Sequence, residues 1–261
     1  MAIYSHSRLS SFEQCPLKYK YRYIDKIIPD LEKSIEALLG TCVHEVLEWI
    51  YKNIKDKTPS LEEIILYYVS IWEQNYFPEI RIIKKGLDPK DYFNKGVQFL
   101  IDYYTKNYPF QDNTLEVERK ILINLDEQGH YKIQGFIDRL VYNLEKNELE
   151  VHDYKTANSL PTQEKVDNDR QLALYAIAIK EAFGKEKEVK LIWHYLAYNK
   201  RIESKRTNQQ LENLKKETIE LIKQIESTTE FPTNKSVLCN WCEYKDICPV
   251  WSKQKELDIW N

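Results

Sequence analysis

Apolar side chains recur every three or four residues in the first part of this chain and every second residue further on. The three-to-four spacing is typical of helices that bury one face. Ser60 and Glu63 have the spacing of a capping box, so a helix is expected to begin there. The predicted helices of this part cover residues 10–23, residues 35–51, a segment starting at residue 60, and residues 90–106.

Period-two alternation begins at Leu115 and predicts strands in place of helices. Two turns around Gly129 and Asn147 separate three such segments, which is the pattern of a three-stranded meander. A long helix is expected after Thr207, which stands three residues before Gln210. The remaining predicted elements are strands over 115–123, 131–142, 148–155 and 188–198, and a helix over 165–183.

The order of these elements predicts an α/β protein with one domain over residues 1–261. The sequence contains neither an internal repeat nor a clear linker. We expect a helical insertion over about 52–110, a core over about 111–230, and a C-terminal cysteine motif over 232–251.

The amino-acid composition reduces the number of functional classes to which the protein can belong. The net charge of −3 argues against a protein that coats nucleic acid by bulk charge, although it permits a local basic groove. A phosphate-binding Gly-Lys loop and an apolar run long enough to span a bilayer are both absent, so neither a built-in motor nor a membrane protein is expected. We expect a cytoplasmic protein, in which five cysteines indicate metal or redox chemistry.

The segment LEVHDYKTA places an acid and an amine at the end of a strand. Asp153 and Lys155 are two residues apart and therefore share a face. Asp138, in GFIDRL on the preceding strand, approaches Asp153 if the two strands are antiparallel neighbours. Two carboxylates at strand ends suit Mg²⁺ or Mn²⁺, and such a site hydrolyses phosphodiesters. For the D-x-K triplet alone, an ordinary salt bridge is the favoured alternative.

The wider set of motifs resembles the PD-(D/E)XK nuclease superfamily, and within it the RecB-like branch. Four matches occur in the expected order: GTCVH ending at His44, GFIDR containing Asp138, DYKT beginning at Asp153, and QLALY running from Gln171 to Tyr175. The resemblance implies a restriction-endonuclease-like core, in which a central mixed sheet is flanked by helices.

The same resemblance assigns roles to individual residues. His44, Asp138, Asp153 and the backbone carbonyl of Tyr154 are implied metal ligands. Lys155 is the implied catalytic lysine, with Gln171 and Tyr175 supporting the substrate or the metal. Outside the family context, His44 reads as a partly buried helix residue, and Gln171 and Tyr175 as partners of each other. A further acid, Glu118, is expected to be solvated or paired with Arg119 or Lys120.

Four cysteines form a candidate ligand set at the two ends of the chain. Cys239, Cys242 and Cys248 have the spacing C-x2-C-x5-C, and Cys15 lies far upstream. Four thiolates suit one Zn²⁺ or one [4Fe–4S] cluster, and the spacing alone leaves both open. The arrangement resembles the iron–sulfur members of the RecB-like branch, such as AddB-type nucleases and CRISPR-associated exonucleases, which favours the cluster. Cys42 reads as a small buried hydrophobe.

Basic and aromatic residues alternate in KYKYRY near the N-terminus. Lys18, Lys20 and Arg22 are therefore candidate contacts for DNA phosphates. Lysines lying over a tyrosine-rich core face explain the same pattern equally well.

These observations predict a Mg²⁺- or Mn²⁺-dependent DNA nuclease. The resemblance implies an exonuclease acting on single strands or DNA ends, in repair, recombination or CRISPR adaptation, with any helicase supplied by a separate chain. The alternatives are a non-catalytic adaptor module that binds DNA ends, an endonuclease or RNA-acting nuclease, and a zinc-stapled structural protein.

Overall fold

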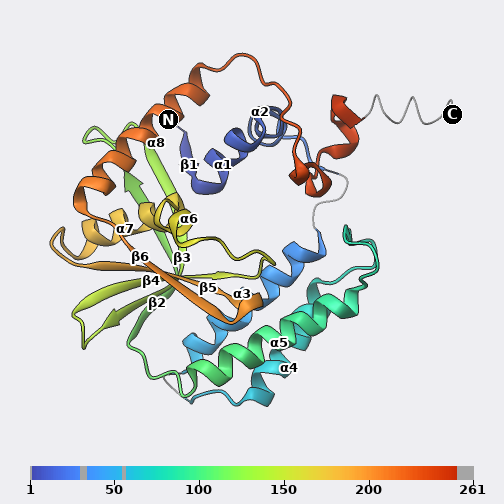
Figure 1. The fold of residues 1–261 in the computed structure, drawn as a ribbon, viewed down its shortest axis with the longest axis vertical. Helices are drawn as coiled ribbons and strands as arrows, with labels where there is room; N and C mark the ends of the chain where they lie inside the picture. The colour runs from blue at the N-terminus through green and yellow to red at the C-terminus, as the bar shows by residue number, and fades with distance from the viewer. Residues whose placement is uncertain (1, 30–33, 55–56, 252–261) are drawn as a thin grey trace.

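A mixed six-stranded sheet forms the centre of the described part of the molecule (Figure 1). The structure is a computed structural model that describes residues 2–29, 34–54 and 57–251. The strands follow the order β1-β3-β4-β5-β6, and β2 pairs with β3. They are β1 (Ile3–Ser5), β2 (Thr114–Asn124), β3 (Lys132–Asn143), β4 (Glu148–Lys155), β5 (Val189–Tyr195) and β6 (Lys200–Lys205).

Helices cover both faces of the sheet, and this α/β arrangement confirms the predicted fold class (Figure 1). The α-helices are α1 (His6–Gln14), α2 (Pro16–Tyr19), α3 (Ile35–Asn53), α4 (Leu61–Asn75), α5 (Pro89–Asn107), α6 (Gln163–Asp167), α7 (Arg170–Phe183) and α8 (Asn208–Ser227). The shorter helical turns are η1 (Lys20–Ile24), η2 (Leu196–Tyr198), η3 (Val237–Trp241) and η4 (Lys245–Ile247). None of the helices in the described segments is long and apolar enough to cross a bilayer.

Local sequence explains most of these boundaries. Strands β2, β3 and β4 form the predicted antiparallel meander, and the predicted capping box of Ser60 and Glu63 is present. The single helix expected over 10–23 is wrong, because the chain is extended at Cys15, which precedes a proline. The helix expected over 165–183 is also interrupted, since the side chain of Asp169 caps a new helix, α7.

Two strands were not predicted from the sequence pattern. Strand β1 has only three residues, too few to show a period. Strand β6 lies at the sheet edge, and most of its side chains are exposed, so its sequence lacks the apolar alternation of a half-buried strand.

One edge of β3 changes partner along its length. Its pairing with β1 covers Lys132 to Gln134, and its pairing with β4 begins only at Arg139. The corresponding residue of β4 is His152, so the end of β4 diverges from β3. The sheet therefore forks between β1 and β4, and Asp138 and Asp153 lie at this fork.

Each face of the sheet has its own hydrophobic core. Helices α7 and α8 cover one core, which includes Val151 and Trp193 of the central strands. Helices α3, α4 and α5 cover the other core, which includes Tyr154. Successive side chains of a strand alternate between faces, so Asp153 and Lys155 face α7 while Tyr154 faces α3.

The segment around α2 and the C-terminal segment that follows α8 lie side by side (Figure 1). The Leu17 N–H donates to the carbonyl of Pro232 at 3.2 Å, and the Tyr244 hydroxyl donates to the carbonyl of Ile27 at 3.1 Å. The C-terminal cysteine motif is therefore positioned against α2.

Candidate active site

Three side chains at the fork converge in a group suited to a divalent cation. His44 of α3, Glu118 of β2 and Asp138 of β3 each offer one ligand atom, and these atoms lie within 4.8 Å of one another. His44 Nδ1 and Asp138 Oδ2 are 3.5 Å apart. Neighbouring ligands of one Mg²⁺ are separated by about 3 Å, so the two atoms need only a small movement to share an ion.

The backbone of Tyr154 holds two of these ligands in place. Its N–H donates to Asp138 Oδ2 at 2.8 Å, and its carbonyl lies 2.8 Å from His44 Nε2. In the neutral imidazole, Nε2–H donates to that carbonyl and leaves the Nδ1 lone pair facing Asp138. The carbonyl was predicted to bind metal itself; in this structure it orients the histidine.

Glu118 is the site residue that the sequence pattern missed. Its φ of +47° lies in the left-handed region, where a non-glycine residue is strained, and this turn rotates its side chain toward the site. The expected pairing with Arg119 is wrong, because Arg119 is bound to Glu116. Burial, and next the charge of Glu48, raise the pKa of Glu118. Alternation of apolar residues carries no signal for such a turn.

Asp153 and Lys155 form the α7 side of the site. Lys155 Nζ lies 2.7 Å from Asp153 Oδ2 and donates to Gln171 Oε1 at 3.0 Å. Gln171 in turn donates to the Tyr175 hydroxyl at 3.3 Å, so Tyr175 supports the lysine through Gln171. Burial acts to lower the pKa of Lys155, but the charge and hydrogen bond of Asp153 outweigh it and raise the pKa. Lys155 is therefore an ammonium that stabilises negative charge.

The two carboxylates predicted to converge are close enough to affect each other. The β3–β4 ladder stops at Arg139, the residue that follows Asp138. Asp138 accepts a hydrogen bond from the Tyr154 N–H, whereas Asp153 pairs with Lys155. Burial, followed by the charge of Asp153, raises the pKa of Asp138 well above its usual range. A cation bound at the fork relieves this repulsion, which is the electrostatic reason to expect one.

The raised pKa of Asp138 predicts a pH dependence of the metal-free protein. Asp138 holds its proton to a higher pH in the native state than in the unfolded state, where its pKa is about 3.9. Its contribution to stability therefore falls as pH rises from that value through the folded-state pKa. Over the same interval, Mn²⁺ affinity is expected to rise.

Thermal unfolding in EDTA from pH 4.5 upward, together with Mn²⁺ titrations, measures both effects. Asp138→Asn is expected to flatten both pH profiles relative to wild type. Identical profiles for the two proteins would contradict the assignment.

Two glycines of the sequence motifs make room for other motif residues. A Cβ on Gly135 would lie 2.5 Å from the ring of Tyr175, and a Cβ on Gly40 would lie 3.3 Å from Thr156 Oγ1. Gly135 therefore allows α7 to pack closely against β3, which places Gln171 beside Lys155.

Gly135→Ala is expected to lower the rate of the DNA cleavage that the sequence predicts by about 10- to 100-fold. The reason is that displacing the Tyr175 ring also displaces Gln171 and Lys155. Steady-state digestion measures the loss. Tyr175→Phe keeps the ring and removes only the hydroxyl, so its effect should be smaller. Full activity in Gly135→Ala would show that this packing does not position the lysine.

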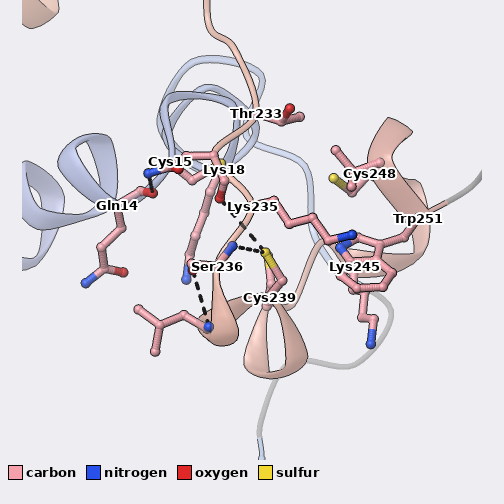
Figure 2. A pocket seen from close by; sticks show the side chains of 14 residues that line it. Gln14, Cys15, Lys18, Thr233, Lys235, Ser236, Cys239, Lys245, Cys248 and Trp251 are labelled. Carbon is pink, nitrogen blue, oxygen red and sulfur yellow. Dashed lines mark hydrogen bonds between the residues drawn. The ribbon is translucent and has the colours of Figure 1, made fainter.

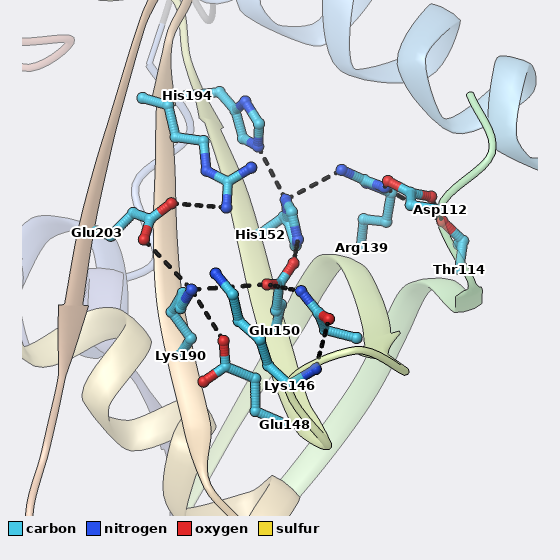
Figure 3. A network of polar contacts seen from close by, with 12 residues as sticks. Asp112, Thr114, Arg139, Lys146, Glu148, Glu150, His152, Lys190, His194 and Glu203 are labelled. Carbon is cyan, nitrogen blue, oxygen red and sulfur yellow. Dashed lines mark hydrogen bonds and ion pairs between the residues drawn. The ribbon is translucent and has the colours of Figure 1, made fainter. Parts of the chain in front are cut away.

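A buried polar network links Arg139, His152 and His194 (Figure 3). Through Arg139 this network also reaches Tyr154. The Arg139 guanidinium is only 1% exposed; it donates to the Tyr154 hydroxyl at 3.0 Å and to His152 Nδ1 at 3.0 Å. Asp112 pairs with the same guanidinium. Tyr154 is thus fixed through its ring by Arg139 and through its backbone by His44 and Asp138.

The four predicted cluster cysteines line one pocket between the two ends of the chain. Figure 2 shows Cys15, Cys239 and Cys248 around this pocket, and Cys242 also contributes to its wall. The Ser236 N–H donates to Cys239 Sγ at 3.4 Å. Cys42 lies elsewhere, buried in the core beneath α3. Chain folding therefore brings together cysteines that are 224 residues apart in sequence (239 − 15).

The predicted DNA-contacting residues are engaged within the protein. Lys18 pairs with Glu243 at 3.0 Å, Arg22 with Glu243 at 3.6 Å, and Lys20 with Asp25 at 2.5 Å. Two of the three ion pairs join the N-terminal helices to the cysteine motif, which is a structural role. A role in contacting DNA stays a prediction.

The forked sheet, the acid–histidine group and the half-buried Lys155 ammonium are the arrangement expected of a metal-dependent nuclease. The profile of the PD-(D/E)XK nuclease superfamily matches residues 3–249, and the chain belongs to this superfamily. Its members use divalent metals, and His44, Glu118 and Asp138 are able to bind one.

One solved structure, titled "Crystal structure of SSO0001", is similar at 15% identity with a TM-score of 0.40, covering 93% of this chain and 84% of that one. No curated protein matches the sequence.

Proposed function

We propose that this chain is a RecB-like, Mg²⁺- or Mn²⁺-dependent deoxyribonuclease that digests single-stranded DNA from an end. The observation that carries the proposal is the juxtaposition, at one fork, of a His–Glu–Asp group and a lysine ammonium. The ordered motifs from Gly40 to Tyr175 support the RecB-like branch and its preference for DNA ends.

Each residue of the proposed site has its own chemical role. His44, Glu118 and Asp138 would hold the ion, with Asp153 of β4 as the further ligand that the family resemblance implies. A divalent ion held there would polarise the phosphodiester and lower the pKa of an attacking water. Lys155 stabilises negative charge on the phosphate, and Gln171 keeps the lysine in position by accepting its hydrogen bond.

Digestion of end-labelled substrates tests this proposal. Single-stranded DNA, duplex DNA and RNA of one sequence would be incubated with Mg²⁺, Mn²⁺ or EDTA. Stepwise shortening of single-stranded DNA from one end is expected, and only with metal. Internal cuts would indicate an endonuclease, and preferential RNA cleavage a ribonuclease. DNA binding without any cleavage would indicate the adaptor module and refute the enzyme.

We also propose that Cys15, Cys239, Cys242 and Cys248 bind a [4Fe–4S] cluster. Support comes from the donor set, because four thiols line one pocket and a backbone N–H points at one sulfur, as is common around thiolate ligands. The resemblance of the cysteine arrangement to the iron–sulfur members of the RecB-like branch favours the cluster over a single Zn²⁺.

Cys239→Ser is expected to lose most of the iron and to lower the melting temperature by about 10 °C, because the cluster closes a very long loop. Protein purified without oxygen would be analysed for iron, sulfide and zinc, with about four iron and four sulfide per chain expected in wild type. Cys42→Ala, which removes a thiol outside the pocket, should keep both. One zinc per chain and no sulfide would refute the cluster.

A further inference from the structure

A second pocket lies beside the fork, between α5 and the β5–β6 hairpin. Its volume is about 160 Å³, which is the space of about five water molecules. Lys106 and Asn107 come from the end of α5, His194 from the end of β5, and Lys200 and Arg201 from the start of β6. None of these residues belongs to the metal group at the fork.

Positive charge dominates the wall of this pocket. Lys106, Lys200 and Arg201 line it, and among the described lining residues Asp102 is the single acid. Asp102 accepts a hydrogen bond from Gln98 at 2.8 Å. Arg201 pairs with Glu203 at 2.6 Å, outside the lining, and Lys106 donates to the carbonyl of Asn199 at 3.1 Å. The three cations give the pocket a net charge of +2 before the Glu203 pair is considered.

The floor of the pocket experiences the same positive field. His194 is 7% exposed, and its Nε2 lies 2.9 Å from His152 Nδ1. Arginine only donates, so the Arg139 bond makes His152 Nδ1 an acceptor, and His194 Nε2 must carry the proton between the two rings. Burial, and next the neighbouring His152, lower the pKa of His194 well below its usual value, and Arg139, Arg201 and Lys106 contribute less. Cations that disfavour an added proton favour an anion at the same place.

The pocket is also close to the metal site. Tyr154 and His194 are register partners on β4 and β5, and their ring centroids are 5.1 Å apart. Tyr154 is the residue whose backbone holds His44 and Asp138. An anion in the pocket therefore lies beside β5. The ring of Tyr154 separates it from His44 and Asp138, the residues proposed to bind the metal.

We propose that this pocket binds a phosphate group through Lys106, Lys200 and Arg201. A basic pocket of this size next to a nuclease site suits either a phosphate of the nucleic-acid strand or free phosphate. Assignment to the strand rests on the proposed nuclease function, whereas phosphate binding itself does not.

Binding measurements without metal separate this proposal from catalysis. Inorganic phosphate, and a short single-stranded oligonucleotide with either a 5′-phosphate or a 5′-hydroxyl, would be titrated calorimetrically in EDTA. The test variant is Lys106→Gln with Lys200→Gln. The control is Lys146→Gln with Lys216→Gln, which removes the same charge from exposed positions elsewhere. Thermal unfolding would verify that both variants are folded.

The test variant is expected to bind inorganic phosphate at least tenfold more weakly than the control. Tighter binding of the 5′-phosphorylated oligonucleotide, lost in the test variant, would assign the pocket to a strand end. Equal binding of the two oligonucleotides, lost in the test variant, would assign the pocket to an internal phosphodiester. Binding of inorganic phosphate without binding of either oligonucleotide would assign the pocket to free phosphate. Absent or equal phosphate binding in the two variants would overturn the proposal. Failure of DNA cleavage leaves these results unaffected, since no metal is present.

Discussion

Asp138→Asn and Asp153→Asn are each expected to reduce metal-dependent cleavage by about 10³-fold or more. Asp138 is a member of the acid–histidine group, and Asp153 raises its pKa from the neighbouring strand. An amide at either position removes a negative charge that balances the cation. The amide oxygen at position 138 still accepts the hydrogen bond from the Tyr154 N–H, so the fold should be preserved.

Single-turnover cleavage of the preferred substrate, with Mn²⁺ affinity measured in parallel, checks this expectation. Weaker Mn²⁺ binding should accompany the loss of rate in both variants. Glu217→Gln is the matched control, since Glu217 is an exposed acid on α8 and its loss should leave both quantities unchanged. Wild-type rates in either aspartate variant would exclude the fork as the reaction centre.

Arg139→Met is expected to lower the free energy of unfolding by about 3 kcal/mol, or roughly 6–12 °C in melting temperature. The substitution removes a buried charge and takes one hydrogen-bond donor away from each of Tyr154 and His152. Asp112 is more than a third exposed, so water recovers part of its lost pairing and limits the cost. Arg139→Lys should recover little, because an ammonium cannot reach all the partners of the guanidinium fork.

The contacts of Arg139 predict a second effect, a change in Mn²⁺ affinity, which a general loss of stability does not produce. Arg139 contacts the ring of Tyr154, whose backbone holds His44 and Asp138. Mn²⁺ affinity measured well below the melting temperature should therefore fall about 10- to 100-fold, as for other residues that orient metal ligands. Arg119→Met is the control, since its ion pair lies on β2 and is partly exposed. Equal metal affinity in Arg139→Met and wild type would reduce Arg139 to a purely structural role.

The sequence by itself determined the parts of this protein that depend on local periodicity and motif spacing. Alternating apolar residues predicted the β2–β3–β4 meander, and the spacing of Ser60 and Glu63 predicted the start of α4. The ordered motifs predicted two aspartates and the lysine of the candidate site, and they resembled the superfamily to which the chain belongs. The four-residue spacing of Gln171 and Tyr175 predicted that they share a helix face, because that distance is about one helical turn.

The tertiary structure decided what depends on contacts between distant segments. Strand β1 pairs with the part of the β3 edge that β4 does not pair with, and this creates the fork. The sequence of no single segment predicts this fork. A left-handed residue inside β2 turns Glu118 into the site, although alternation predicts nothing of its direction. The pairing of β4 with β5 places His194 beside Tyr154. Propensity and spacing describe neighbours along the chain, whereas a site of this kind is built from side chains that meet only when the chain is folded.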